Sequence, residues 1–116
     1  MAHAMSLDQA EQESRDFIHA HDIAFALESI LSQAPMQGEA YNVANGDQIK
    51  ISVLCSMILN TLDLDLFVRS SGIAQPGAPF NWQADISRLL ALGYTPQIPL
   101  MDGIRSFMAW CREEIK

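Results

Sequence analysis

Residues 15–31 constrain the fold most, because they join a strand pattern directly to a helix pattern. Residues 15–20 carry the β-formers Phe17 and Ile18, and the Asp22 that follows is a residue type that caps helix N-termini. Apolar residues then recur with the spacing of one helix face, at Ile23, Leu27, Ile30 and Leu31. The pattern predicts a strand that leads into an amphipathic helix, with Phe17 and Ile18 in the core.

Strand and helix patterns continue to alternate along the rest of the chain. Pro35 ends the first helix near Gln33, because a proline disfavours helical geometry in the residue before it. The elements expected after it are a strand over 41–44, a short extended piece over 49–51, a helix capped by Ser52, a strand over 64–69, a loop over 72–79, a short helix capped by Asp85 and closed by Gly93, and a last helix from Leu100. The last helix has one apolar stripe, interpreted as core packing: Ile104, Phe107, Met108 and Cys111. This alternation predicts an α/β fold with a small mixed sheet and amphipathic helices, or α+β if the strands pair antiparallel.

Composition narrows the classes of partner. Seven Lys and Arg against 14 Asp and Glu give a formal charge of -7, which disfavours nucleic acid and anionic membranes. Every apolar run is shorter than the roughly 20 residues that span a bilayer, so a cytoplasmic protein is expected. Apolar residues make up 49% of the chain and charged ones only 18%, which predicts that some apolar surface meets a partner.

The residues alone point to no complete active site. The chain has no glycine-rich dinucleotide turn, no P-loop and no G-x-S-x-G nucleophile motif. His19, His21 and Asp22 form one tight cluster of possible metal ligands, but that set is one or two ligands short, and helix capping explains His21 and Asp22 better. Arg15 is either a solvated side chain at a strand edge or a guanidinium fork aimed at phosphate or carboxylate.

Two segments together resemble a known family: R-D-F-I-H-A-H-D-I-A at 15–24 and Y-N-V-A-N-G at 41–46. They are similar to the C-terminal part of NAD-dependent epimerase/dehydratases, which are extended short-chain dehydrogenases that act on nucleotide sugars. The resemblance continues in order through Q-P-G at 75–77, A-D-I-S at 84–87, L-G-Y-T-P at 92–96 and the closing helix over 100–110. Order and spacing together are more specific than any single motif.

The resemblance implies two domains, one that binds the cofactor and one that binds the substrate. In the family, an N-terminal Rossmann domain carries the NAD(P) turn and a Tyr-x-x-x-Lys pair, while the C-terminal lobe closes over the sugar nucleotide. Residues 6–116 are then the substrate-binding domain. Residues 1–5 are interpreted separately as a remnant of cloning, because they contain small residues and a second Met and share no periodicity with the rest of the chain. NAD or NADP is expected in the full-length parent and no cofactor in this fragment. Neither Tyr41 nor Tyr94 has a lysine four residues later, so no catalytic residue is assigned.

The substrate-binding residues implied by the resemblance are Arg15, Gln75, Phe80 and Trp82. Arg15 matches the family arginine that contacts the nucleotide diphosphate, and the others lie near the sugar or base. The chain departs from the pattern at 75–78, where Gln-Pro-Gly-Ala replaces the Arg-x-Gly-Asp of UDP-sugar 4-epimerases. A second phosphate arginine and a ribose-binding carboxylate are therefore missing.

The expected partners are a nucleotide sugar or related small molecule, the missing Rossmann domain, and a second copy of the chain through an exposed apolar face. Two other functions remain open. The chain is either a standalone binding or interaction module with the same fold, or a dehydrogenase lobe for a free sugar or another carbonyl compound.

Overall fold

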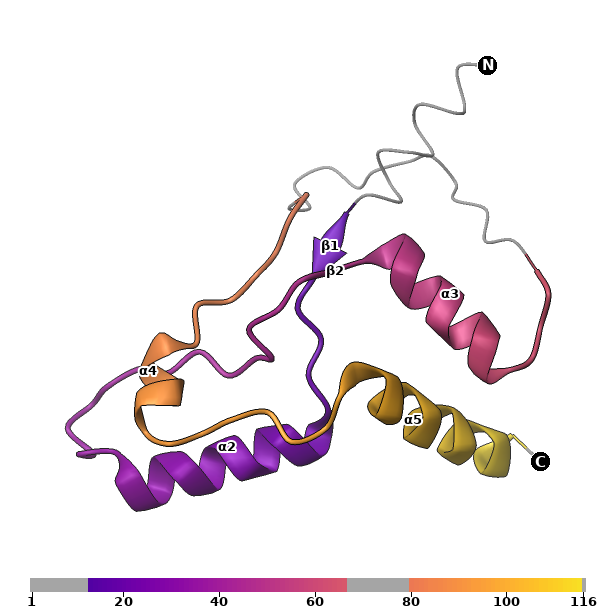
Figure 1. Cartoon of the computed structure of the whole chain (residues 1–116). Helices are drawn as coiled ribbons and strands as arrows, with labels where there is room; N and C mark the ends of the chain where they lie inside the picture. Colours follow the sequence, from indigo (N-terminus) through magenta and orange to yellow (C-terminus); the bar gives the residue numbers. More distant parts are fainter. Residues whose placement is uncertain (1–12, 67–79, 116) are drawn as a thin grey trace.

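A computed structural model describes residues 13–66 and 80–115 of the chain. Its elements, in chain order, are β1 (Ser14–Arg15), α2 (Ala20–Gln33), β2 (Ile49–Lys50), α3 (Ile51–Thr61), α4 (Ser87–Ala91) and α5 (Leu100–Glu114) (Figure 1). Helix α3 packs against α5, and α2 lies beside the segment that joins α4 to α5 (Figure 1).

The sheet is small and mixed. β1 pairs with β2 in antiparallel register, Ser14 opposite Lys50 and Arg15 opposite Ile49. On its other edge Ser14 forms a parallel bridge with Asn81. The bridge consists of two hydrogen bonds, from Ser14 N to Phe80 O at 3.0 Å and from Trp82 N to Ser14 O at 3.1 Å. The predicted fold class is therefore confirmed, with much shorter strands than expected.

The strand expected at 15–20 is too long, and the strand expected at 41–44 is wrong. β1 ends at Arg15, and residues 41–44 form no strand. Directly after residues 41–44, the backbone N–H groups of Asn45 and Gly46 donate to the Asp16 carboxylate, at 2.8 and 2.9 Å, and not to a neighbouring strand. A further strand is expected over 64–69. Residues 64–66 form no strand, and residues 67–69 lie outside the described residues.

Some helix boundaries follow the predictions and others do not. α2 ends at Gln33, α5 begins at Leu100, and Gly93 has the left-handed φ of 92° expected after α4. The N-cap of α2, however, is His19, whose Nδ1 accepts from His21 N at 3.0 Å. α3 begins at Ile51, one residue before the expected cap Ser52.

The N-cap of α4 is Ile86 and not the expected Asp85, although Asp85 Oδ1 accepts from the first helical N–H group, that of Ser87, at 2.9 Å. Backbone and side-chain hydrogen bonds from Ser87 lower the pKa of Asp85. Asp22 is not the cap of α2: it lies in the first helical turn and is completely buried. Its carboxylate holds a distant segment instead.

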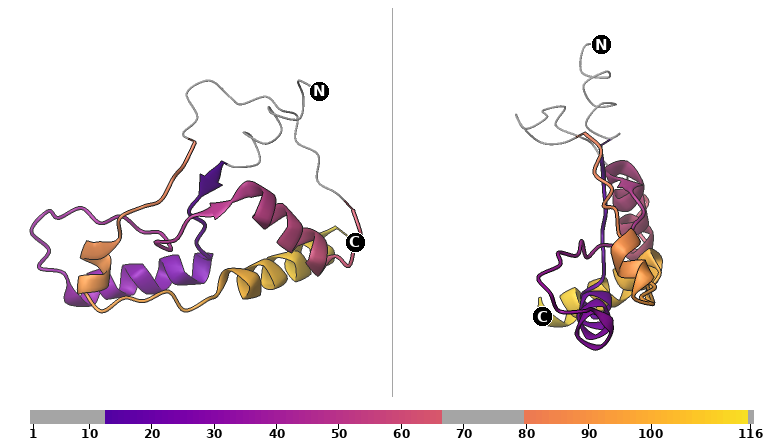
Figure 2. Two further views of the ribbon diagram at one scale, coloured as in Figure 1. Left: turned by 45° about the horizontal axis from the view of Figure 1, so that its top comes forward. Right: turned by 90° about the vertical axis from the view of Figure 1, so that its left-hand side faces the viewer.

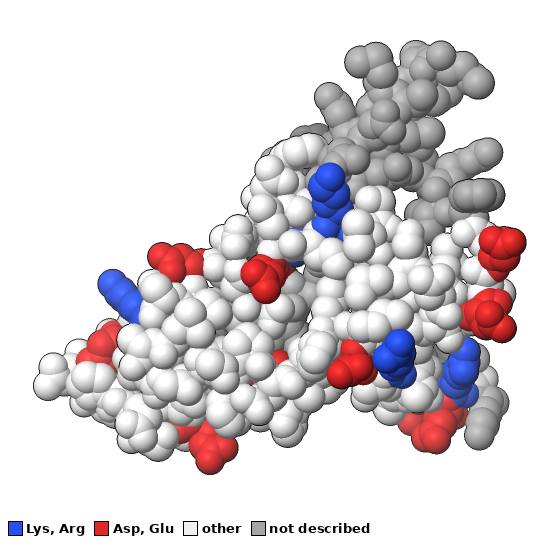
Figure 3. Space-filling view, viewed as in Figure 1, with Lys and Arg blue, Asp and Glu red and all other residues white. Residues whose placement is uncertain are grey.

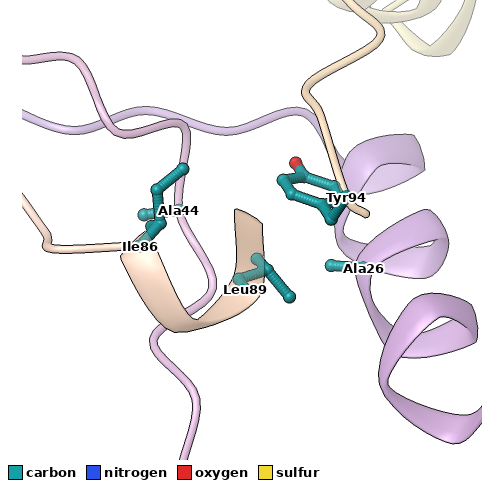
Figure 4. Close-up of a cluster of buried hydrophobic side chains, with 5 residues drawn as sticks. All are labelled: Ala26, Ala44, Ile86, Leu89 and Tyr94. Carbon is teal, nitrogen blue, oxygen red and sulfur yellow. The ribbon is translucent and has the colours of Figure 1, made fainter. Parts of the chain in front are cut away.

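The buried core is small for a chain of this length. The cluster joins α2, α4 and the segments beside them, and consists of Ala26, Ala44, Ile86, Leu89 and Tyr94 (Figure 4). The radius of gyration is 17.2 Å, against about 13 Å for a compact domain of this length. The extents of 55 × 36 × 19 Å describe a flat molecule, seen edge-on on the right of Figure 2. A flat molecule leaves much apolar surface uncovered.

The apolar stripe of α5 is only partly core, so its interpretation as pure core packing is wrong. Ile104 is buried, but Phe107 and Trp110 each remain 57% exposed. Three apolar residues of α2 are exposed as well: Ile23, Leu27 and Leu31. Wide uncharged areas separate scattered acidic and basic groups in Figure 3. The apolar surface expected from composition is therefore present on at least two helices.

Tyr94 gives the core a predictable pH dependence. Its ring is fully buried, and among the described residues its hydroxyl has no hydrogen-bond partner. Burial, followed by the nearby Asp22 and Asp16 carboxylates, raises the pKa of Tyr94 above its usual 10.0. A raised folded pKa means that stability is present below pH 10 and is lost as pH rises through the folded pKa. We expect Tyr94→Phe to remove this alkaline loss in urea unfolding measured from pH 8 to 11.

At neutral pH the same variant should be as stable as the parent or up to about 1 kcal/mol more stable, since it removes a buried hydroxyl without a partner. Tyr41→Phe is the matched control and should keep the alkaline loss. A clear loss of stability of Tyr94→Phe at pH 7 would show that the hydroxyl has a partner.

Candidate functional site

Arg15 is held against its own strand. Its Nη1 donates to Ser14 O at 2.7 Å, and its Nη2 lies 3.5 Å from Glu13 Oε2. The Arg15 side chain is 25% exposed and that of Glu13 is 19% exposed. The guanidinium is therefore a fixed, partly dehydrated cation, a better anion partner than a fully solvated arginine.

The strand register brings Arg15 next to the two predicted aromatic residues. Ser14 pairs with Asn81, and the Ser14 hydroxyl lies 2.9 Å from Asn81 Oδ1, so these two side chains share one face. Because side chains alternate along extended backbone, Arg15 lies on the opposite face with Phe80 and Trp82. Phe80 is 50% exposed and Trp82 54% exposed. The result is an arginine on the same strand face as two exposed aromatic residues.

The opposite face of β1 is filled by polar side chains that fix the register. The Ser14 hydroxyl is buried and lies 2.6 Å from Gln48 Oε1 as well as 2.9 Å from Asn81 Oδ1. A hydroxyl carries one proton, so it donates to one of these oxygens at a time. These contacts join three chain segments at the point where Arg15 leaves the strand.

The Asp16 carboxylate holds the segments of the site together, a role that the sequence does not predict. Besides the N–H groups of Asn45 and Gly46, its Oδ2 accepts from Ala84 N at 3.4 Å. One carboxylate thus ties the end of β1 to the loop at 45–46 and to the segment that carries Phe80 and Trp82. The only local signal was an acidic residue directly after Arg15, and no periodicity marks such a role.

Of the four predicted site residues, strand alternation places Arg15, Phe80 and Trp82 on one face of the bridged segments. Gln75 lies outside the described residues. His21 is exposed and His19 caps α2. Within residues 13–66 and 80–115, no three His, Cys, Asp or Glu side chains gather closely enough to hold a metal ion. In the same part of the chain no helix has the length and hydropathy to cross a membrane.

An apolar groove of about 570 Å³ opens between the 17–20 segment, α3 and α5. Its walls include Phe17 and Ile18, which are half-buried rather than core, and the exposed Phe107 and Trp110, whose ring centroids are 5.9 Å apart. Gly103 lets α5 approach His19, since a Cβ at this position would lie 3.1 Å from His19 Cδ2. Sequence reasoning missed the groove because it assigned the whole α5 stripe to the core.

The geometry defines a class of protein: a small mixed α/β lobe with one fixed arginine and two aromatic rings at a sheet edge, and an apolar groove on an incomplete core. No protein-family model matches the sequence. A protein described as putative GDP-L-fucose synthase 2 from Arabidopsis thaliana is 28% identical over 102 residues, which are 87% of this chain and 30% of that protein.

Solved structures give the same relationship. UDP-N-acetylglucosamine 4-epimerase from Methanobrevibacter ruminantium M1, in complex with UDP-N-acetylmuramic acid, matches with a TM-score of 0.79 and 27% identity over 90% of this chain and 33% of that one. RMD from Pseudomonas aeruginosa, complexed with NADPH, matches with a TM-score of 0.71 and 25% identity over 85% of this chain and 33% of that one.

The chain is a relative of the NAD-dependent epimerase/dehydratases of the extended short-chain dehydrogenase/reductase family, and it corresponds to their C-terminal part. It spans about a third of the length of these relatives. The family expected from the sequence is confirmed.

Proposed function

We propose that residues 6–116 are the substrate-binding lobe of an NAD(P)-dependent sugar-nucleotide epimerase, dehydratase or reductase. The observation that carries the proposal is the shared face of Arg15, Phe80 and Trp82, formed by segments far apart in the sequence. The similarity to a 4-epimerase in complex with a UDP-sugar supports the same ligand class.

Each residue has a distinct task in this proposal. The Arg15 fork offers paired N–H donors to the oxygens of a diphosphate. The rings of Phe80 and Trp82 offer flat apolar surfaces to a base or a sugar. The family resemblance gives Gln75 a hydrogen-bonding amide for the same ligand. No residue of this chain is given a catalytic role, because neither tyrosine has the lysine of the family pair and Tyr94 is buried. Turnover therefore needs the part of the enzyme that binds NAD or NADP.

The exposed apolar surfaces fit a missing partner domain. Ile23, Leu27 and Leu31 are exposed on α2, and the groove beside α5 is lined mainly by apolar residues. Contiguous exposed apolar surface commonly marks an interaction site. We propose that an N-terminal Rossmann domain covers them in a cytoplasmic enzyme, and that a second copy of the chain covers them where that domain is absent.

Arg15→Gln tests the proposal directly. Loss of a charge-assisted contact of about 1.5 to 3 kcal/mol should weaken binding of UDP- or GDP-sugars about 10- to 100-fold, measured by titration calorimetry. Arg105→Gln is the matched control, because Arg105 is 65% exposed and pairs only with Asp102 on α5 at 3.5 Å among the described residues. Equal affinities of the two variants would contradict a role of Arg15 in binding.

Two alternatives have observations in their favour. The broad apolar surface favours a binding module for another protein. The absence of the Arg-x-Gly-Asp pattern at 75–78 favours a lobe for a free sugar or another carbonyl compound. Saturable binding of a nucleotide sugar that depends on Arg15 would argue against both.

A further inference from the structure

We propose that Glu13 is an internal competitor for Arg15, so that a ligand phosphate must displace the Glu13 carboxylate before it binds. The inference rests on the proposed function, because it concerns access to the same guanidinium. It assigns Glu13 a role in setting affinity and in releasing the bound nucleotide, beyond the contacts that a substrate itself makes.

The placement of Glu13 is fixed by backbone contacts. Its carbonyl oxygen accepts from Ile51 N at 2.8 Å, which ties Glu13 to the first turn of α3. By strand alternation its side chain shares the face of Arg15, Phe80 and Trp82. Glu13 Oε2 lies 3.5 Å from Arg15 Nη2, so the carboxylate occupies one N–H group of the guanidinium that a ligand oxygen would use.

The Glu13–Arg15 ion pair has a geometry that allows a phosphate to replace the Glu13 carboxylate. The distance of 3.5 Å is long for a charge-assisted hydrogen bond, which is usually about 2.7 to 2.9 Å. A phosphate oxygen with good geometry makes a stronger contact with the same N–H group. The shorter bond from Nη1 to Ser14 O, at 2.7 Å, keeps the guanidinium in place while the carboxylate leaves. Glu13 thus offers a weak bond that a phosphate can replace.

Glu13 as a competitor for Arg15 and Glu13 as a residue that positions Arg15 lead to opposite predictions for anion binding. If Glu13 competes, its neutralisation tightens anion binding; if it only positions Arg15, its neutralisation weakens binding. The probe is inorganic pyrophosphate, with UDP and a UDP-sugar in parallel titrations of the full chain. The variants are Glu13→Gln and, as a control with the same change in net charge, Glu28→Gln on the exposed side of α2.

Glu13→Gln should bind pyrophosphate about threefold more tightly than the parent, the size expected for loss of one partly exposed ion pair. Glu28→Gln should change the affinity for pyrophosphate by less than Glu13→Gln does. When Arg15 is also replaced by Gln, Glu13→Gln and Glu28→Gln should change that affinity equally. Weaker or unchanged pyrophosphate binding of Glu13→Gln, or no binding at all, would overturn the inference.

The UDP-sugar arm separates this inference from the proposed function. Tighter pyrophosphate binding by Glu13→Gln, without any binding of UDP-sugar beyond that of pyrophosphate, supports the competitor and contradicts the nucleotide-sugar function. UDP-sugar binding that depends on Arg15 but is not improved in Glu13→Gln supports the function and contradicts the competitor.

Discussion

Replacement of Asp22 by alanine should lower the free energy of unfolding by about 3 kcal/mol, because two charge-assisted hydrogen bonds are lost inside the fold. The Asp22 carboxylate is fully buried and accepts from Gln97 N and from Ile98 N, each at 3.0 Å. These bonds fasten the first turn of α2 to the segment that leads into α5. Urea unfolding followed by circular dichroism measures the change.

Asp47→Ala is the control for Asp22→Ala, since Asp47 is exposed and its loss should cost less than about 0.5 kcal/mol. Asp22→Asn should lower the free energy of unfolding by an amount between those of Asp22→Ala and Asp47→Ala, because an amide keeps one acceptor oxygen and loses the charge. Ile98 also lines the apolar groove, so Asp22→Ala should loosen that wall. Equal stabilities of the Asp22 and Asp47 variants would show that the buried carboxylate contributes nothing.

The sequence predicts best what short-range rules decide. Pro35 sets the end of α2 and Gly93 the left-handed turn after α4, and both act on adjacent residues. Asp22 shows where such rules fail. A capping residue type at a strand-to-helix junction predicts a cap, but the N–H groups that Asp22 binds lie 75 and 76 residues further along the chain. Local propensity contains no information about that distant partner.

The candidate site likewise combines features that the sequence predicts with contacts between distant residues that it does not predict. Family resemblance predicts Arg15 and the aromatic pair as site residues, and their common strand face depends on a bridge between Ser14 and Asn81, 67 positions apart. Glu13 had no motif, since its role depends on a side-chain contact with Arg15. The groove was missed because periodicity identifies an apolar face of α5 but not what covers it. Phe107 and Trp110 have core spacing and exposed side chains because the lobe is flat.

Gly46→Ala should cost about 3 kcal/mol of unfolding free energy, the second of the two largest effects expected from a single substitution. Gly46 has a φ of 89°, where an L side chain is strained by about 1 to 2 kcal/mol. A Cβ there would also lie 2.8 Å from Ile86 Cδ1 and 3.1 Å from Ile86 Cγ1. Ile86 belongs to the buried cluster, so it cannot move without disturbing its neighbours.

Gly93→Ala separates backbone strain from the steric clash. Gly93 has nearly the same φ, 92°, but a Cβ at this position meets nothing within 4 Å, so only the strain remains. The difference between the two variants measures the clash with Ile86. Gly46 also binds Asp16 through its N–H and Gln83 Nε2 through its carbonyl, at 2.9 and 2.7 Å. A shift of this loop therefore reaches the segment of Phe80 and Trp82. If the proposed function holds, Gly46→Ala should also weaken nucleotide-sugar binding while Gly93→Ala does not.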